Sequence, residues 1–160
     1  MDHIKFKYNY DYNIGLANDK QTKYNPTLIP FLSNNDKHII DIKSCYWYGY
    51  SVALDNNGNV YAAGTYSKTV FAKNKDKPDD YYQSWHKVDS LSNQNIVQMD
   101  VGYGGGYGYS LFVTNNGDVW SCGENTCGEL GLGFVSKNQW DVAQQSCLLV
   151  FLKKICHIQH

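Results

Sequence analysis

The chain has 160 residues, of which 42% are hydrophobic and 18% are charged, and its formal net charge is −1. This balance is typical of one globular domain. All 14 basic residues are scattered lysines, and arginine, the usual residue for bidentate contacts with guanine and phosphate, is absent. The composition therefore argues against a surface dedicated to direct nucleic-acid binding. Tyrosine is abundant and glutamate occurs only at Glu124 and Glu129, which favours strands over helices and predicts an all-β fold.

The sequence also carries signals about the cellular setting. The five cysteines are an odd number, and no Asn-x-Ser/Thr glycosylation acceptor without proline occurs. The N-terminal residues are polar and charged, unlike a signal peptide. No apolar run approaches the ~18 residues that a membrane-spanning helix needs. We therefore expect an intracellular protein of the cytoplasm or nucleus with no membrane partner.

Short motifs in the first 32 residues recur near the end of the chain. Residues 9–17 match residues 125–133, and residues 28–32 match residues 148–152. We assign residues 1–32 to the tail of one repeat and the start of the next. Residues 148–160 are assigned to the start of a further repeat.

Two more complete copies of the repeat lie between these segments. Residues 51–64 align without gaps to residues 110–123, and residues 39–42 align to residues 96–99. The repeat cores are assigned to residues 33–91 and 92–147, within one repeat domain that spans residues 1–160. Copies repeated at this regular spacing along the chain indicate an array of similar structural units.

Each core is predicted to contain a β-hairpin. The dipeptides Asn57-Gly58 and Asn116-Gly117 are strong hairpin signals, because both central residues of a type I′ turn need positive φ. Residues 102–108, which are rich in glycine and tyrosine, are expected to form an enlarged loop between two strands. Four short strands for each ~58 residues suggest propeller blades, with a period longer than the ~40–45 residues of WD-type repeats. The expected architecture is a partial β-propeller of about two to three four-stranded blades.

The most specific motif is in residues 110–133, which read SLFVTNNGDVWSCGENTCGELGLG. This segment resembles the signature of the regulator of chromosome condensation repeat family, in which a Gly-x-Asn-x-x-Gly-Gln-Leu-Gly-Leu-Gly segment follows the hairpin. The chain departs from the family pattern at Glu129, where glutamine is usual, and at Tyr50 and Tyr109, where histidine is usual. The middle copy also lacks the Leu-Gly-Leu-Gly tail. The resemblance is that of a divergent and partial relative.

The resemblance implies a fold and a range of functions. Family members typically form closed seven-bladed propellers, whereas this chain has material for fewer than three blades. It is therefore either a fragment, a degenerate copy or part of an assembly, and its open blade edges could pair with other chains. The founding member of the family acts as a guanine-nucleotide exchange factor for the small GTPase Ran.

Candidate catalytic and metal sites are weak. Zinc ligands could come from two nearby cysteines and from the C-terminal cysteines and histidines (Cys122, Cys127, Cys147, Cys156, His157 and His160), but their spacing is irregular. Residues 102–108 fail the pattern of a phosphate-binding loop, and Asp79-Asp80 lies in a polar stretch that suggests an insertion. We therefore predict no cofactor, no metal and no enzymatic activity.

Aromatic residues gather at equivalent loops of the two cores and form the candidate partner-binding rim, which consists of Tyr46, Trp47, Tyr48, Tyr103 and Tyr107. Corresponding loops on one face of a repeat protein often form its binding surface. The alternative is that these rings only cap the blade cores. The predicted function is a non-enzymatic protein–protein interaction module with an unknown protein partner. A regulator of a small GTPase by nucleotide exchange and a non-functional fragment of a larger repeat protein are the alternatives.

Overall fold

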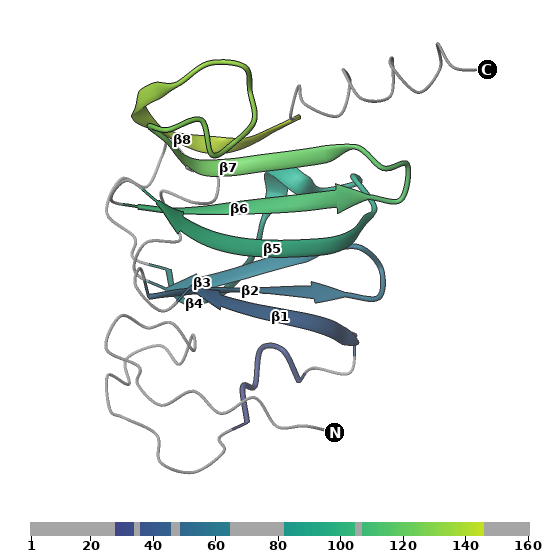
Figure 1. Cartoon of the computed structure of the whole chain (residues 1–160). Helices are drawn as coiled ribbons and strands as arrows, with labels where there is room; N and C mark the ends of the chain where they lie inside the picture. The colour runs from purple at the N-terminus through teal and green to yellow at the C-terminus, as the bar shows by residue number, and fades with distance from the viewer. Residues whose placement is uncertain (1–27, 34–35, 46–48, 65–81, 105–106, 146–160) are drawn as a thin grey trace, which may run out of the picture.

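Two four-stranded antiparallel sheets are stacked on one another in the computed structural model (Figure 1). The structure describes residues 28–33, 36–45, 49–64, 82–104 and 107–145. The first sheet, here called the first blade, contains β1 (Ile39–Cys45), β2 (Tyr50–Asp55), β3 (Val60–Gly64) and β4 (Tyr82–Lys87). The second blade contains β5 (Ile96–Gly104), β6 (Tyr107–Thr114), β7 (Val119–Asn125) and β8 (Ser136–Gln145). A short 3₁₀ helix, η1 (Asp89–Leu91), lies between the blades in the chain.

Both blades are meanders, in which each strand pairs with the next one along the chain. The β2–β3 and β6–β7 hairpins form at the two predicted positions, with Leu54 opposite Val60 and Val113 opposite Val119. The blades thus repeat the same strand order, as the sequence repeat predicted. This arrangement places equivalent residues of the two copies at equivalent points of neighbouring blades.

The turns of these hairpins differ from the type I′ turn that the Asn-Gly dipeptides predicted. Gly58 and Gly117 have φ angles of 78° and 77°, but neither Asn57 nor Asn116 is among the residues with positive φ. The Gly58 N–H donates to the Asp55 carbonyl at 3.1 Å, and the Asp55 N–H donates to the Asn59 carbonyl at 3.0 Å. This is a three-residue loop, a type I turn closed by a bulged glycine. The first asparagine of each pair therefore belongs to the turn without needing positive φ.

The prediction of an enlarged loop at residues 102–108 is wrong, because this segment extends the β5–β6 hairpin. Gly102 pairs with Tyr109, Tyr103 with Gly108, and Gly104 with Tyr107. A Cβ atom placed on Gly102 would lie 2.4 Å from the Tyr109 ring, so this ring covers the glycine across the strand pair. A tyrosine that packs over a cross-strand glycine compensates for the missing side chain. The alternation of glycine and tyrosine therefore supports strand pairing.

The main hydrophobic core lies between the blades. Alternate residues of a strand point to opposite faces, so Tyr50, Val52 and Leu54 of β2 all face the second blade. They join one buried cluster with Met99 and Phe112 of the second blade. Phe112 has no exposed surface, and its burial stabilises the stack by about 2 kcal/mol relative to an exposed ring. The blades are thus held together by a shared core.

The opposite face of the first blade has its own core. Ala53, Ala63 and Trp85 pack there with Leu32 from the segment that precedes β1. Leu32 is 7% exposed, and Ile29 packs against the same cluster. The first blade is therefore covered on both faces, which explains the nearly continuous apolar sequence of β2 and β3.

Asp55 is a buried hydrogen-bond acceptor at the end of β2, with 1% of its surface exposed. Its Oδ1 atom accepts from the N–H groups of Asn57 at 2.9 Å and Asn59 at 2.8 Å. Its Oδ2 atom accepts from the Asn59 side-chain amide and from the Tyr61 hydroxyl, each at 2.9 Å. Burial disfavours the charged carboxylate, but these hydrogen bonds outweigh that effect and hold the pKa of Asp55 below its usual value.

Tyr61 makes the stability of the first blade sensitive to alkaline pH. Burial, the hydrogen bond to Asp55 and the charge of Asp55 raise the pKa of Tyr61 to about 12. Because this pKa lies above the ordinary value of 10.0, the contribution of Tyr61 to stability is complete below pH 10.0 and is lost as the pH rises through about 12. Urea unfolding between pH 8 and pH 12 should show this loss. Tyr61→Phe should flatten the pH dependence in this window, and an unchanged profile would contradict the account.

Candidate protein-binding rim

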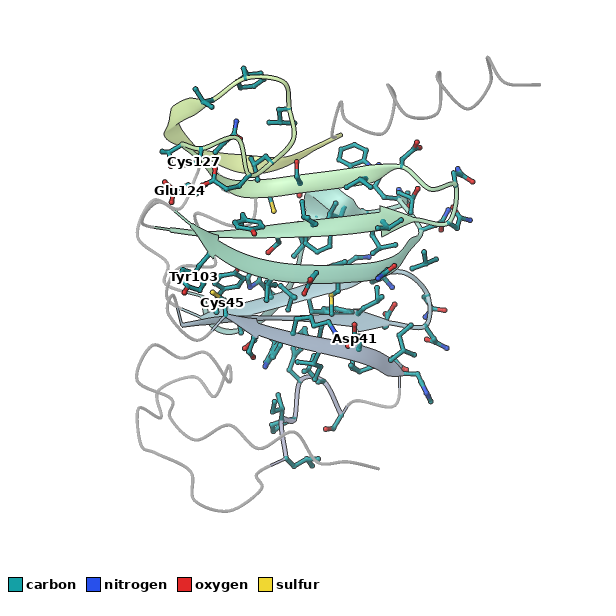
Figure 2. All side chains as sticks on the ribbon, in the orientation of Figure 1. Asp41, Cys45, Tyr103, Glu124 and Cys127 are labelled. Carbon is teal, nitrogen blue, oxygen red and sulfur yellow. The ribbon has the colours of Figure 1, made fainter. Side chains whose placement is uncertain are left out.

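The ends of the β1–β2 and β5–β6 hairpins lie side by side at one end of the stacked blades, and we call this end the rim. Figure 2 shows Cys45 and Tyr103 next to each other there. The Cys45 thiol is 3.8 Å from the Gly102 carbonyl of the neighbouring blade. The two equivalent segments that the sequence predicted to share a rim are therefore adjacent where the structure describes them.

Tyr50 fixes the two hairpins relative to each other. Its ring is fully buried, and its hydroxyl donates to the Tyr109 carbonyl at 2.8 Å and lies 3.4 Å from the Ser110 hydroxyl. A Cβ atom on Gly108 would lie 2.5 Å from the Tyr50 ring, so only glycine leaves room for it. Burial raises the pKa of Tyr50 well above its usual range, so the phenol stays a donor. The sequence had marked Tyr50 only as a departure from histidine.

The structure places two of the five predicted rim residues. Tyr103 is 58% exposed near the end of β5, and the backbone of Tyr107 pairs with Gly104 at the start of β6. Tyr46, Trp47 and Tyr48 lie outside the described residues. Tyr103 is thus a large, mostly exposed aromatic side chain on a hairpin that Tyr50 contacts at Gly108 and Tyr109. A binding role for the five residues stays a prediction.

Asn125 explains why the most specific motif of the sequence contains an asparagine. Its side-chain amide donates to the Phe134 carbonyl at 2.8 Å, and its oxygen accepts from the Leu130 N–H at 3.2 Å. The Ser121 hydroxyl also donates to the Leu130 carbonyl at 2.9 Å. These bonds fold the loop between β7 and β8 against its own blade. Sequence reasoning identified the motif but missed this role.

Two buried carboxylate oxygens have no hydrogen-bond partner, Oε2 of Glu124 at the end of β7 and Oε1 of Glu129 in the loop that follows. The other oxygens are bonded: Glu124 Oε1 accepts from the Thr126 hydroxyl at 2.6 Å, and Glu129 Oε2 accepts from the Cys127 N–H at 2.9 Å. Figure 2 shows Glu124 and Cys127 at the same end of the strands as Tyr103. A buried carboxylate oxygen without a donor costs stability.

Replacing Glu129 with glutamine should therefore stabilise the protein. Glutamine keeps an oxygen for the Cys127 N–H and replaces the unpartnered anionic oxygen with a neutral amide. We expect Glu129→Gln to raise the free energy of unfolding by about 1 kcal/mol in urea denaturation. Glu129→Ala should lower it, because the Cys127 N–H then loses its acceptor. A glutamine variant less stable than the parent would show that the carboxylate is favourable.

The described cysteines do not form a metal site with one another. Cys122 is buried between the blades, and burial strongly raises the pKa of its thiol, which disfavours the thiolate that binds metal. Cys127 is exposed on the loop. Among the described residues no group of three or more histidine, cysteine or acidic side chains could hold a metal ion. Cys147, Cys156, His157 and His160, like Asp79 and Asp80, lie outside the described residues.

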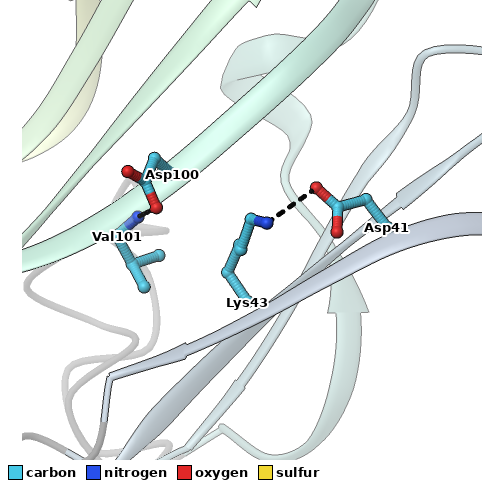
Figure 3. A network of polar contacts seen from close by, with 4 residues as sticks. All are labelled: Asp41, Lys43, Asp100 and Val101. Carbon is cyan, nitrogen blue, oxygen red and sulfur yellow. Dashed lines mark hydrogen bonds and ion pairs between the residues drawn. The ribbon is translucent and has the colours of Figure 1, made fainter. Parts of the chain in front are cut away.

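The carboxylates on β1 and β5 have local roles (Figure 3). Asp41 lies 3.4 Å from the Lys43 ammonium, and both side chains are partly exposed. Asp100 accepts a hydrogen bond from the Val101 N–H at 2.9 Å. A solvated ion pair of this kind contributes little to stability. In the described part of the chain, no helix is long and apolar enough to cross a membrane.

Both blades are four-stranded meanders that share a core, and their hairpin ends lie on one rim. This arrangement defines a partial β-propeller. The sequence of residues 96–129 matches the regulator of chromosome condensation (RCC1) repeat. The chain thus resembles this repeat family in a divergent and partial form, as the motif in residues 110–133 indicated. No curated protein sequence is significantly similar to the chain.

Solved structures of propellers are similar to the chain over most of its length. Human WBSCR16 superposes with a TM-score of 0.64 and 22% identity, over 86% of this chain and 33% of that protein. Prp20p from Saccharomyces cerevisiae, in a study of its binding to Gsp1p and histones, gives a TM-score of 0.62 and 18% identity, over 86% of this chain and 32% of Prp20p. Yeast RCC1 (Prp20) in a complex with Kap60 gives a TM-score of 0.56 and 21% identity, over 83% and 30% of the two chains.

These similarities confirm the predicted fold class, an all-β partial propeller with blades of the regulator of chromosome condensation type. The chain spans about a third of the length of these solved structures. It is a repeat-based module of the kind that these larger propellers contain.

Proposed function

We propose that the chain is a non-enzymatic protein–protein interaction module that binds its partner through the rim. The observation that carries this proposal is the 58% exposure of Tyr103 on a hairpin that the first blade contacts at the adjoining residues Gly102, Gly108 and Tyr109. The Tyr50 hydroxyl and the Cys45 thiol both contact the β5–β6 hairpin from the neighbouring blade. A rigid aromatic side chain in solvent contributes large contact area on binding and loses little conformational entropy.

The other four rim residues extend this surface in the proposal. Tyr46, Trp47 and Tyr48 come from the equivalent segment of the first blade, and Tyr107 lies opposite Gly104. The lysine-only basic content gives no reason to assign nucleic acid as the partner. We accordingly assign a protein partner and place the interaction in the cytoplasm or nucleus.

A site-specific photo-crosslinker tests the rim. The crosslinking amino acid is placed at Tyr103 in one variant and at Val97 in a control, because Val97 is 55% exposed on the same strand. Irradiation in the producing cells should give a discrete crosslinked protein at position 103 only, identified by mass spectrometry. Tyr103→Ala should weaken the binding of that protein by about tenfold or more. Crosslinking at position 97 alone, or at neither position, would refute the rim.

A small GTPase is the second candidate partner, and the structural similarity to Prp20p, which was studied for its binding to Gsp1p and histones, is what favours it. If the chain regulates a small GTPase by nucleotide exchange, it should accelerate the release of labelled GDP from that GTPase. Stopped-flow measurements on a panel of GTPases test it, with Tyr103→Ala as the matched variant. No acceleration across the panel would remove exchange activity and leave the interaction proposal standing. A crosslinker that finds no partner at the rim would instead favour a non-functional fragment.

A further inference from the structure

The second blade has a partly open face on the side that points away from the first blade. On β6, Phe112 is fully buried toward the first blade. The alternate residues Tyr109, Leu111 and Val113 therefore point to the other side of the sheet. Val119 lies opposite Val113 on β7 and shares that side. We call these four residues the outer face, and all four side chains are partly exposed.

The strand next to the outer face is polar. Asp100 of β5 pairs with Leu111, so its exposed side chain lies on the same side of the sheet. The exposed Gln98 pairs with Val113 and lies there too. An apolar segment with a positive charge beside it would therefore match this side of the second blade.

The first blade shows how the equivalent face is covered. Its equivalent residues are each at most 1% exposed, namely Tyr50, Val52, Leu54 and Val60. They share one core with the second blade and with Val88 and Leu91, which follow β4 in the chain. The Val88 N–H donates to the Val60 carbonyl at 2.9 Å, so the chain continues along the sheet before it reaches Leu91. The residues that follow the last strand of the first blade thus help to cover that blade.

The chain leaves both blades at the same point of the sheet. Lys87 pairs with Tyr61 at the end of β4. Gln145 pairs with Trp120, the equivalent of Tyr61, at the end of β8. In the first blade, Leu91 is four residues beyond Lys87 and is buried in the shared core. The residue four positions beyond Gln145 is therefore expected to lie over the second blade.

The segment that follows β8 has the composition to cover the outer face. Residues 148–152, which lie outside the described residues, read LLVFL and are all apolar. Leu149 is four residues beyond Gln145, the same spacing as in the first blade. The matching residues 28–32 precede the first blade, and their Leu32 packs on a sheet face of that blade. A segment of this kind therefore already covers one sheet face in the described part of the chain.

We propose that residues 148–152 form a cap that packs on the outer face of the second blade, with Leu149 in the place that Leu91 has in the shared core. The lysine pair at 153–154 follows directly and supplies the positive charge beside Asp100. Both apolar surfaces are removed from water in this contact. The cap occupies the place where a further blade would pack, so it keeps an exposed apolar face from other chains. The cap lies on a sheet face and the rim at the hairpin ends, so the two proposals are independent.

A photo-crosslinker tests the cap in the full chain. A small aliphatic diazirine amino acid replaces Leu149 and keeps the position apolar, so this test does not depend on a destabilising variant. Isotopically heavy and light chains are mixed, so that crosslinks within one chain are distinguished from crosslinks between chains. The cap predicts crosslinks within one chain to β6 or β7, and Leu111→Asp should lower their yield about tenfold.

Ile40→Asp is the matched control for the crosslinking yield, since Ile40 is 55% exposed on β1 of the first blade. This variant should leave the yield unchanged. Crosslinks that join different chains, crosslinks to β1–β4 in place of β6 and β7, or no crosslinks at all would overturn the proposal.

Dye binding separates a capped outer face from one that stays open. Leu149→Asp should displace the cap, because an unpaired carboxylate is not tolerated on an apolar face. The fluorescence of the dye ANS should then rise several-fold while the near-UV circular dichroism keeps its native form. Ile158→Asp is the matched control, because it makes the same change outside residues 148–152, and it should leave the dye signal unchanged. No rise for Leu149→Asp, or equal rises for the two variants, would contradict the cap.

Discussion

Asp55→Ala is expected to lower the free energy of unfolding by about 3 kcal/mol or more in urea denaturation, one of the two largest effects in this protein. The carboxylate accepts four hydrogen bonds while only 1% of its surface is exposed. Alanine would leave the Tyr61 hydroxyl and the N–H groups of Asn57 and Asn59 without their acceptor. The loss includes the cost of burying these donors unpaired.

Thr114 offers the matched control, because it occupies the equivalent position of the second blade. Its hydroxyl accepts a backbone hydrogen bond from the Asp118 N–H at 3.0 Å, where Asp55 accepts four hydrogen bonds. Thr114→Val should therefore cost only about 1 kcal/mol. The pKa of the Asp55 carboxyl is held below its usual value of 3.8. The stabilisation by Asp55 should therefore be complete above pH 3.8 and should be lost as the pH falls through the pKa of the folded state. Equal losses for Asp55→Ala and Thr114→Val would contradict the role of Asp55 as a multiple acceptor.

Gly108→Ala is expected to destabilise the stack by about 2–3 kcal/mol, because the added Cβ atom would be forced against the Tyr50 ring. The closest ring atom would lie 2.5 Å away, and Tyr50 has no exposed surface into which it could move. The clash arises between the blades, so the variant should weaken their contact while each hairpin still pairs. Thermal or urea unfolding measures the loss.

A double-mutant cycle identifies the cause of that loss. In a Tyr50→Leu background the ring and its hydrogen bond to the Tyr109 carbonyl are both absent. Gly108→Ala should then cost much less than it does in the parent protein, with a coupling energy of about 1 kcal/mol or more. Additive effects of the two substitutions would show that Gly108 is needed for a reason other than room for Tyr50.

The architecture was predictable from the sequence because both the residues shared by the repeat copies and the spacing of these copies indicate it. The gap-free alignment of residues 51–64 with residues 110–123 located both hairpins, and the spacing of the copies predicted the four-stranded blade. Turn geometry was not predictable from the dipeptide alone. Asn57-Gly58 fits a type I′ turn, but the Asp55 carboxylate accepts from the N–H groups of Asn57 and Asn59 and stabilises a longer loop.

The glycine- and tyrosine-rich segment shows a second limit of sequence reasoning. Glycine-rich runs usually indicate loops, but here Tyr109 covers Gly102 and Tyr50 covers Gly108. These contacts join residues that lie on different strands or blades, so local composition could not predict them. The roles of Tyr50 and Asn125 were missed for the same reason, although their fixed positions in the repeat were a signal. Of the predicted rim, only Tyr103 and the backbone of Tyr107 lie within the described residues.

Nuclear Overhauser contacts between the Tyr50 ring and the α-protons of Gly108 test most directly whether the two repeat copies stack as neighbouring blades. A sample labelled in tyrosine, phenylalanine and glycine also provides an internal reference, the edge-to-face contact of Phe31 with Tyr61, whose ring centroids are 5.7 Å apart. The account predicts both contacts in the same sample. The Phe31–Tyr61 contact without any Tyr50–Gly108 contact would show that the first blade folds but does not carry the second blade against it, which would contradict the shared core and the rim built on it.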